Sequence, residues 1–192
     1  MGILLILGIN IVAAVIVMII HEIPKSLTAY LVTHPIYRQN ALPNTKLRQY
    51  VDPIGLCMFV FMGIGWQKSC IYKSSRFRDK EKGMLYVAIE GLLSNIVLII
   101  ILVPIYNITA DAYVKLFVFK LIYFSFGVTI INLLPVTPFD MSKVIQYFSP
   151  EVYYGLIKYE RTIHIVFIIF IASTYGIMLV NGLFNTVIPL KL

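Results

Sequence analysis

Charged side chains are scarce in this chain: Asp, Glu, Lys and Arg make up 13% of its 192 residues, whereas hydrophobic residues make up 59%. Water-soluble domains contain about 25% charged residues. The mean hydropathy of +0.87 agrees with this excess of apolar side chains. We therefore expect an integral membrane protein, with residues 1–192 forming a single membrane domain, because no polar stretch is long enough to fold as a soluble one.

Cysteine is scarce as well, and we expect no cleavable leader. The two cysteines, Cys57 in an apolar segment and Cys70 in a basic one, exclude a disulfide framework, and we expect both to be free thiols. Residues 1–20, "MGILLILGINIVAAVIVMII", lack a basic start and a small-residue cleavage site. We expect this run to remain as a transmembrane helix.

Acidic residues are outnumbered, with 9 Asp and Glu against 16 Lys and Arg, for a net charge of +7. Twelve of the 16 basic residues gather in three polar stretches, 38–48, 68–82 and 143–161. If all three face the cytoplasm, they satisfy the positive-inside rule and attract anionic lipid head groups. We expect anionic lipids at these loops and no nucleic-acid partner, since a basic soluble fold is missing.

Long apolar runs predict an all-α integral membrane protein of the cell membrane with about four full transmembrane helices and an outside N-terminus. A further run, 54–66, is too short to cross and is predicted to be a re-entrant or partial helix. Residues 34–53 are expected to form a loop with short strands, and 141–161 an amphipathic cytoplasmic segment. The full spans are expected at about 3–33, 83–106, 113–134 and 162–186, the last being additional to a core of about 3–148.

Several ionisable residues lie in or beside the predicted spans, where charge is costly and each such group is a functional hypothesis. At a rise of about 1.5 Å per residue, they all fall one to two turns from the same membrane boundary, so they can meet at one level. A zinc-peptidase helix carries H-E-x-x-H, but here Lys25 follows in place of the second histidine. The residues concerned are His21, Glu22, Lys25, Glu90 and Asp140, the last after a helix broken at Pro135 and Pro138.

Four stretches carry a resemblance to a known family: "HEIPKSLTAY", "VDPIGLCMFVFMGIGW", "GMLYVAIEGLLSN" and "INLLPVTPFD". In order and spacing they resemble the zinc-binding helix, the D-P-I-G segment, the A-G-P-L-S-N helix and the N-L-L-P-x-x-P-L-D-G motif of the site-2 proteases. These are intramembrane zinc metallopeptidases, and the likeness is to their small bacterial members. The resemblance implies a site-2 protease core, zinc ligands at His21 and Asp140, Glu22 as the catalytic base, and substrate-binding roles for Asn95 and Asn132.

The chain departs from the family pattern at the metal site itself. An ammonium group has no lone pair for zinc, so Lys25 leaves His21 and Asp140 one ligand short of the usual three. We expect Lys25 to supply the missing positive charge by pairing with Glu22, Glu90 or Asp140, or alternatively to snorkel into the head groups. Further departures are Pro24, Tyr50, Leu92, Glu90 and Met141, which stand where relatives carry other residues.

Other side chains have competing interpretations. His34, His164 and Cys57 are metal-binding types, but we expect loop, interface or packing roles for them. Asn95 and Asn132 are as well explained by interhelical hydrogen bonds as by substrate binding.

Three functions remain open from the sequence. The favoured one is a catalytically inactive pseudoprotease, without a cofactor, that binds a membrane protein or a transmembrane peptide. The second is an active intramembrane zinc protease with a substituted ligand set, and the third is a transporter or channel subunit with a polar path. Internal repeats, which are typical of many transporters, are not visible in the sequence.

Overall fold

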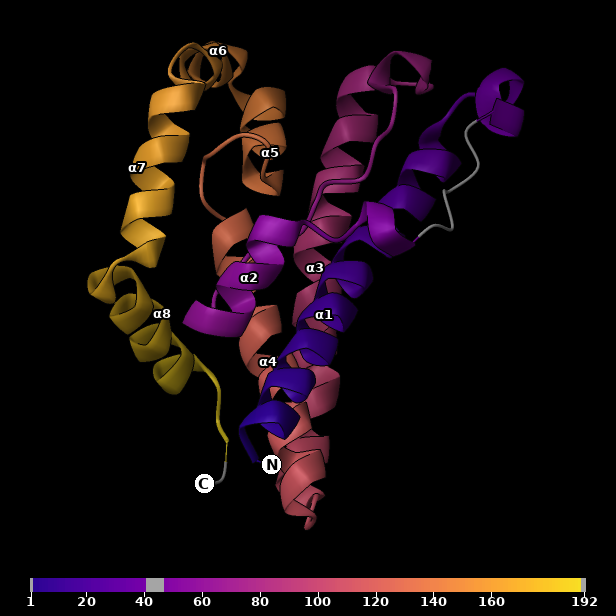
Figure 1. Cartoon of the computed structure of the whole chain (residues 1–192). Coiled ribbons are helices and arrows are strands. Elements are labelled where there is room, and N and C mark those ends of the chain that lie inside the picture. Colours follow the sequence, from indigo (N-terminus) through magenta and orange to yellow (C-terminus); the bar gives the residue numbers. More distant parts are fainter. Residues whose placement is uncertain (1, 41–46, 191–192) are drawn as a thin grey trace.

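A computed structural model of the chain describes residues 2–40 and 47–190, and the regular elements of this part are helices (Figure 1). Three helices are long and apolar enough to cross a membrane, in agreement with the predicted all-helical membrane fold. They are α1 (Gly2–Val32), α3 (Lys80–Ile108) and α4 (Ala112–Asn132), and they pack against one another as a central bundle.

The short apolar run forms a partial helix, as predicted. Helix α2 (Pro53–Met62) begins at Asp52, whose side chain accepts a hydrogen bond from Gly55 N, and ends at Gly63 in a left-handed conformation. The chain then returns along α2 in an extended segment, because Gly55 and Gly65 allow the two backbones to touch. A Cβ at Gly55 would lie 2.0 Å from Trp66 O. This return carries residues 64–70 back toward the central bundle.

The predicted last span, about 162–186, is bent. Two helices, α7 (Glu160–Ala172) and α8 (Thr174–Val187), meet at a bend of 72° and count as one crossing only if the bent pair is taken together. Ser173 caps α8 by accepting a hydrogen bond from Gly176 N. Gly176 in turn lets the two helices approach, since a Cβ there would lie 2.3 Å from Phe170 O.

The amphipathic segment also divides in two. Helix α5 (Asp140–Phe148) ends at Ser149, and α6 (Pro150–Lys158) starts at the proline that follows. The described part of the predicted 34–53 loop contains the 3-10 helices η1 (Pro35–Asn40) and η2 (Leu47–Gln49) instead of strands. An isolated bridge between Thr33 and Phe77 ties the end of α1 to the segment before α3, next to the 3-10 helix η3 (Ser74–Arg76).

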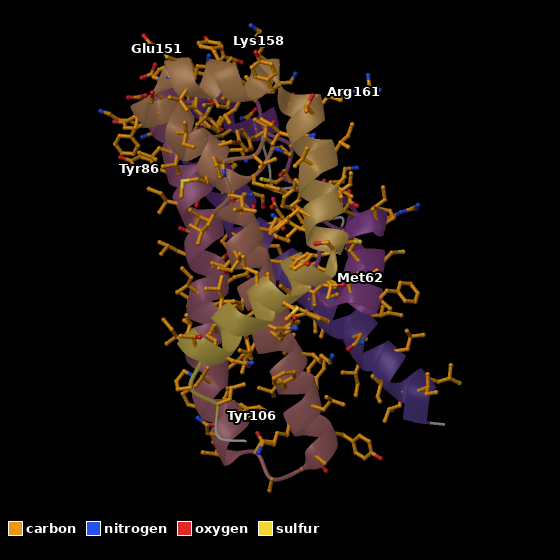
Figure 2. All side chains as sticks on the ribbon, turned by 90° about the vertical axis from the view of Figure 1, so that its left-hand side faces the viewer. Met62, Tyr86, Tyr106, Glu151, Lys158 and Arg161 are labelled. Carbon is orange, nitrogen blue, oxygen red and sulfur yellow. The ribbon has the colours of Figure 1, made fainter. Side chains whose placement is uncertain are left out.

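The polar connections gather at one end of the bundle. The end of α1, the start of α3, and α5 with α6 lie at the top of Figure 1, whereas the N-terminus and the α3–α4 turn lie at the bottom. Figure 2 places Lys158 and Arg161 at the first end and Tyr106 near the opposite one. The described parts of the three basic stretches therefore lie toward one end of the bundle, which the sequence-based topology requires.

Candidate functional site

A fully buried group of polar and charged side chains lies where α1, α3, α4 and α5 meet. Helix α1 contributes His21, Glu22 and Lys25, each with 0% of its surface exposed. Residues at spacings of three and four share a helix face, so the HEIPK sequence directs these side chains to the same side. Pro24 stands inside the same turn, yet α1 continues through it to Val32.

Lys25 is the central cation of this cluster. Its Nζ lies 2.8 Å from Glu22 Oε1 and 2.8 Å from Asp140 Oδ1. Asp140 is also fully buried and is the first residue of α5, brought to the site by the break after α4. Lys25 therefore joins α1 to α5 and does not snorkel, because its side chain is completely enclosed.

His21 connects the same carboxylate to α3. Its Nε2 lies 3.0 Å from Asp140 Oδ2, and its Nδ1 lies 3.0 Å from Asn95 Nδ2. A carboxylate can only accept, so Nε2 carries the proton in the first contact, and in the neutral ring Nδ1 accepts from the Asn95 amide. Both ring nitrogens are thus engaged by protein groups.

Glu22 is held by donors from the return segment that follows α2. Its Oε2 accepts a hydrogen bond of 2.6 Å from Cys70 N, and its Oε1 accepts one of 3.2 Å from Gln67 Nε2. Gln67 also donates to Asn132 Oδ1 at 3.3 Å, which extends the network to the end of α4. Both oxygens of this fully buried carboxylate therefore accept hydrogen bonds from the protein.

Lys143 completes the charge balance of the cluster. It lies one helical turn after Asp140, with Nζ 3.3 Å from Asp140 Oδ1 and 15% of its side chain exposed. Beside His21, two carboxylates thus face two ammonium groups. A buried ionic group of this kind is stable only when every charge is paired and hydrogen-bonded.

Gly91 allows the helices to approach at this level. A Cβ at this position would lie 2.2 Å from Asp140 Oδ2 and 2.6 Å from Lys25 Cδ. The glycine therefore makes room for the ion pair between α1 and α5 on the inner face of α3.

The structure brings together most of the residues singled out from the sequence, but not all of them. The network contains six of these residues: His21, Glu22, Lys25, Asn95, Asn132 and Asp140. Glu90 is half-buried and forms no ion pair with another described residue. Of the three carboxylates considered as partners of Lys25, Glu90 is therefore the one it does not contact. Tyr50 is 2% exposed, and its hydroxyl donates a hydrogen bond of 3.3 Å to Ser26 Oγ.

The additional candidate metal ligands lie apart from the cluster. His34 is exposed beyond the end of α1, and Cys57 is exposed on α2. His164 of α7 contacts the carbonyl oxygen of Thr137, in the turn that leads to Asp140. Leu92 and Met141 are half-buried.

Three participants were not identified from the sequence as site residues: Gln67, the backbone N–H of Cys70, and Lys143. Gln67 is the first polar residue after the apolar run that ends at Trp66, and Lys143 has the i+3 spacing from Asp140. Burial, with a further contribution from Glu22, raises the pKa of the Cys70 thiol to about 12. The protonated thiol is therefore the favoured form of Cys70 in these surroundings.

The donor set does not fit a zinc ion. Zinc requires ligand atoms at about 2.0–2.2 Å in a tetrahedral shell, usually three from the protein in a catalytic site. Within the described residues, no group of three or more His, Cys, Asp or Glu side chains has an arrangement that could hold a metal. The space between Glu22 and Asp140 is occupied by the Lys25 ammonium, which donates to both and would repel a dication.

Comparisons with known proteins add no relative: no family model matches the chain, and neither the curated proteins nor the solved structures gave a match. The fold and its apolar helices define the class, an all-helical protein with three or four helices able to span a membrane.

Proposed function

We propose that the chain is a site-2 protease-like membrane protein that has exchanged its metal for an internal lysine and binds a membrane segment without cutting it. One observation carries the proposal: the Lys25 ammonium lies 2.8 Å from both Glu22 and Asp140 in a fully buried site. In the family that the sequence resembles, the position of Lys25 belongs to the second zinc-binding histidine, that of Glu22 to the catalytic base, and that of Asp140 to the third zinc ligand.

The arrangement argues against hydrolysis by the same groups. A general base must be within hydrogen-bond reach of a water that attacks the substrate. Both Glu22 oxygens already accept hydrogen bonds, from Lys25, Gln67 and Cys70 N. The cluster is thus better suited to fixing the positions of α1, α5 and the return segment than to activating water.

A binding role fits the surroundings of the cluster. The return segment 64–70 runs next to Glu22 without belonging to a helix, and its Gln67 side chain donates a hydrogen bond to the Asn132 amide of α4. Non-helical backbone at membrane depth is tolerated only where it is buried in protein or lines a cavity. With the basic loops cytoplasmic and the N-terminus outside, this segment lies on the cytoplasmic side of the cell membrane.

Photo-crosslinking at Tyr72, the half-buried residue that follows the return segment, tests the proposal. With p-benzoylphenylalanine at this position, we expect a crosslinked adduct to a membrane protein, and we expect that partner to keep its full-length mass. The adduct should form to the same extent whether position 22 is the native Glu or is changed by Glu22→Gln. The matched position is Tyr113, an exposed aromatic at the opposite end of the bundle, where we expect no such adduct.

Two results would contradict the proposal. A shortened partner whose appearance requires Glu22 indicates an active protease. Proton or ion flux in vesicles that requires the charged cluster indicates a transporter.

A further inference from the structure

Glu90 and its neighbour Gly91 point in different directions from α3, about 100° apart around the helix axis. Gly91 is buried against Asp140 and Lys25, whereas Glu90 is half-buried. Tyr86, Leu93 and Val97 are 52%, 47% and 51% exposed, and their spacing from Glu90 places all four on a common face. We call Tyr86, Glu90, Leu93 and Val97 the outer α3 face; it lies apart from the buried cluster.

Glu90 lies within the apolar part of the helix. It comes six residues after Met84, where the apolar stretch of α3 begins, a depth of about 9 Å at 1.5 Å per residue. Ionisable side chains at such depth almost always pair with another group. Glu22 and Asp140 follow this rule, each with a lysine at 2.8 Å, whereas Glu90 belongs to none of the ion pairs found among the described residues.

Lys120 of a second copy of the chain does not lie at the depth of Glu90. Among the lysines of the three long helices, Lys120 of α4 is a candidate, with its Nζ 5.8 Å from the centre of the Phe124 ring. Counted from the α3–α4 turn, Lys120 lies about 13 Å from Asp111 along α4, and Glu90 lies about 27 Å from Ile108 along α3. In two copies with the same orientation in a membrane, the two charges are therefore about 14 Å apart in depth.

The outer α3 face continues into a groove toward the basic end of the bundle. The groove is lined by Leu31 and Val32 of α1, by residues at the start of α3 and by the two residues before it: Arg78, Asp79, Lys82, Gly83 and Tyr86. On α1, Leu27 and Leu31 are 50% and 53% exposed at the i,i+4 spacing. A helix packed here would therefore contact apolar side chains on both sides of Glu90.

We propose that the outer α3 face is a docking surface for a transmembrane helix of another protein that carries a lysine or arginine at the depth of Glu90. Charge complementarity selects this occupant, because a cation on a membrane helix satisfies the unpaired carboxylate and its apolar neighbours cover the exposed side chains. The proposal does not depend on the pseudoprotease assignment, since the outer α3 face shares no residue with the buried cluster.

Designed peptides test the proposal in lipid vesicles that contain the full chain. The probe is a 24-residue Leu/Ala helix with basic residues at one end and a single lysine six residues inside that end, and the matched peptide has methionine in its place. Association is measured by energy transfer from the peptide to a dye on Cys57, which is exposed. We expect the lysine peptide to bind about tenfold more tightly, the size of a strong interhelical polar contact.

The preference should disappear in Glu90→Gln and persist in Glu81→Gln, a matched change in the first turn of the same helix. Equal binding of the methionine peptide by Glu90→Gln and by the native chain shows that the variant is folded. A peptide with its lysine moved seven residues deeper should bind the native chain no more tightly than the methionine peptide. This comparison requires no variant of the protein. Equal binding of the lysine and methionine peptides, a preference retained by Glu90→Gln, or indifference to lysine depth would each overturn the proposal.

Discussion

Replacement of Lys25 by methionine should lower the free energy of unfolding by about 3–5 kcal/mol, the usual cost of removing one partner from a buried ion pair. The change leaves Glu22 and Asp140 buried with a single remaining ammonium, that of Lys143. Methionine preserves most of the side-chain volume, so the loss reports on charge and not on a cavity. Denaturant unfolding of the protein in detergent micelles measures it.

Lys82→Met is the matched control for this loss. Lys82 also pairs with an acid three residues away, Asp79, but at 3.7 Å and with the two side chains 58% and 49% exposed. An exposed pair contributes about 0–1 kcal/mol, so this variant should resemble the native chain.

A neutral triple variant separates charge from packing at the same site. Lys25→Met combined with Glu22→Gln and Asp140→Asn removes the cation together with both anions, and we expect it to recover most of the stability lost by the single change. If Lys25→Met unfolds no more easily than Lys82→Met, the buried cluster is not held together by its charges.

Gly91→Ala should destabilise the protein by about 1–3 kcal/mol, in spite of the better helix propensity of alanine. The added methyl group would lie 2.2 Å from Asp140 Oδ2 and 2.6 Å from Lys25 Cδ. Asp140 cannot give way easily, because His21, Lys25 and Lys143 all hold its carboxylate. The unfolding assay used for Lys25 also measures this effect.

Gly127→Ala is the control, since Gly127 is buried in α4 and a Cβ there meets nothing within 4 Å. We expect this change to be neutral or to stabilise by up to about 1 kcal/mol, through the reduced entropy of the unfolded chain. Equal tolerance at both glycines would mean that α3 does not approach the ion pair as closely as the structure has it.

The sequence predicted much of the cluster because helical spacing and membrane depth are local properties. His21, Glu22 and Lys25 share a face by their positions alone. A proline-broken helix next to Asp140 lets non-helical backbone reach a buried polar site. What spacing cannot predict is the choice of partner. Glu22, Glu90 and Asp140 were equal candidates for Lys25, and only the direction in which α3 faces separates Glu90 from the others.

The donors from the return segment could not be predicted for a related reason. Gln67 and the N–H of Cys70 reach Glu22 because the chain reverses after α2, and this reversal depends on close contact between Gly55 and Trp66. Such contact is a tertiary property. Gly63 gives a local signal for the end of α2, but it does not indicate where the following residues lie.

The broken last span has a similar cause. Hydropathy averages over residues 162–186 and is insensitive to a single serine, whereas Ser173 offers a side-chain cap that competes with the continuing helix. The contact that Gly176 allows with Phe170 then sets the bend between α7 and α8. Composition predicted the apolar character of this region but not its interruption.

Zinc content per chain of the detergent-purified protein, measured beside a Lys25→His variant prepared in the same way, tests the central claim most directly. Lysine at this position supplies positive charge within the cluster, whereas the introduced histidine would complete a three-ligand set with His21 and Asp140. We expect the native chain to contain almost no zinc and the variant to bind about one ion per chain. A native chain that already holds about one zinc, lost in Asp140→Ala, would contradict the account.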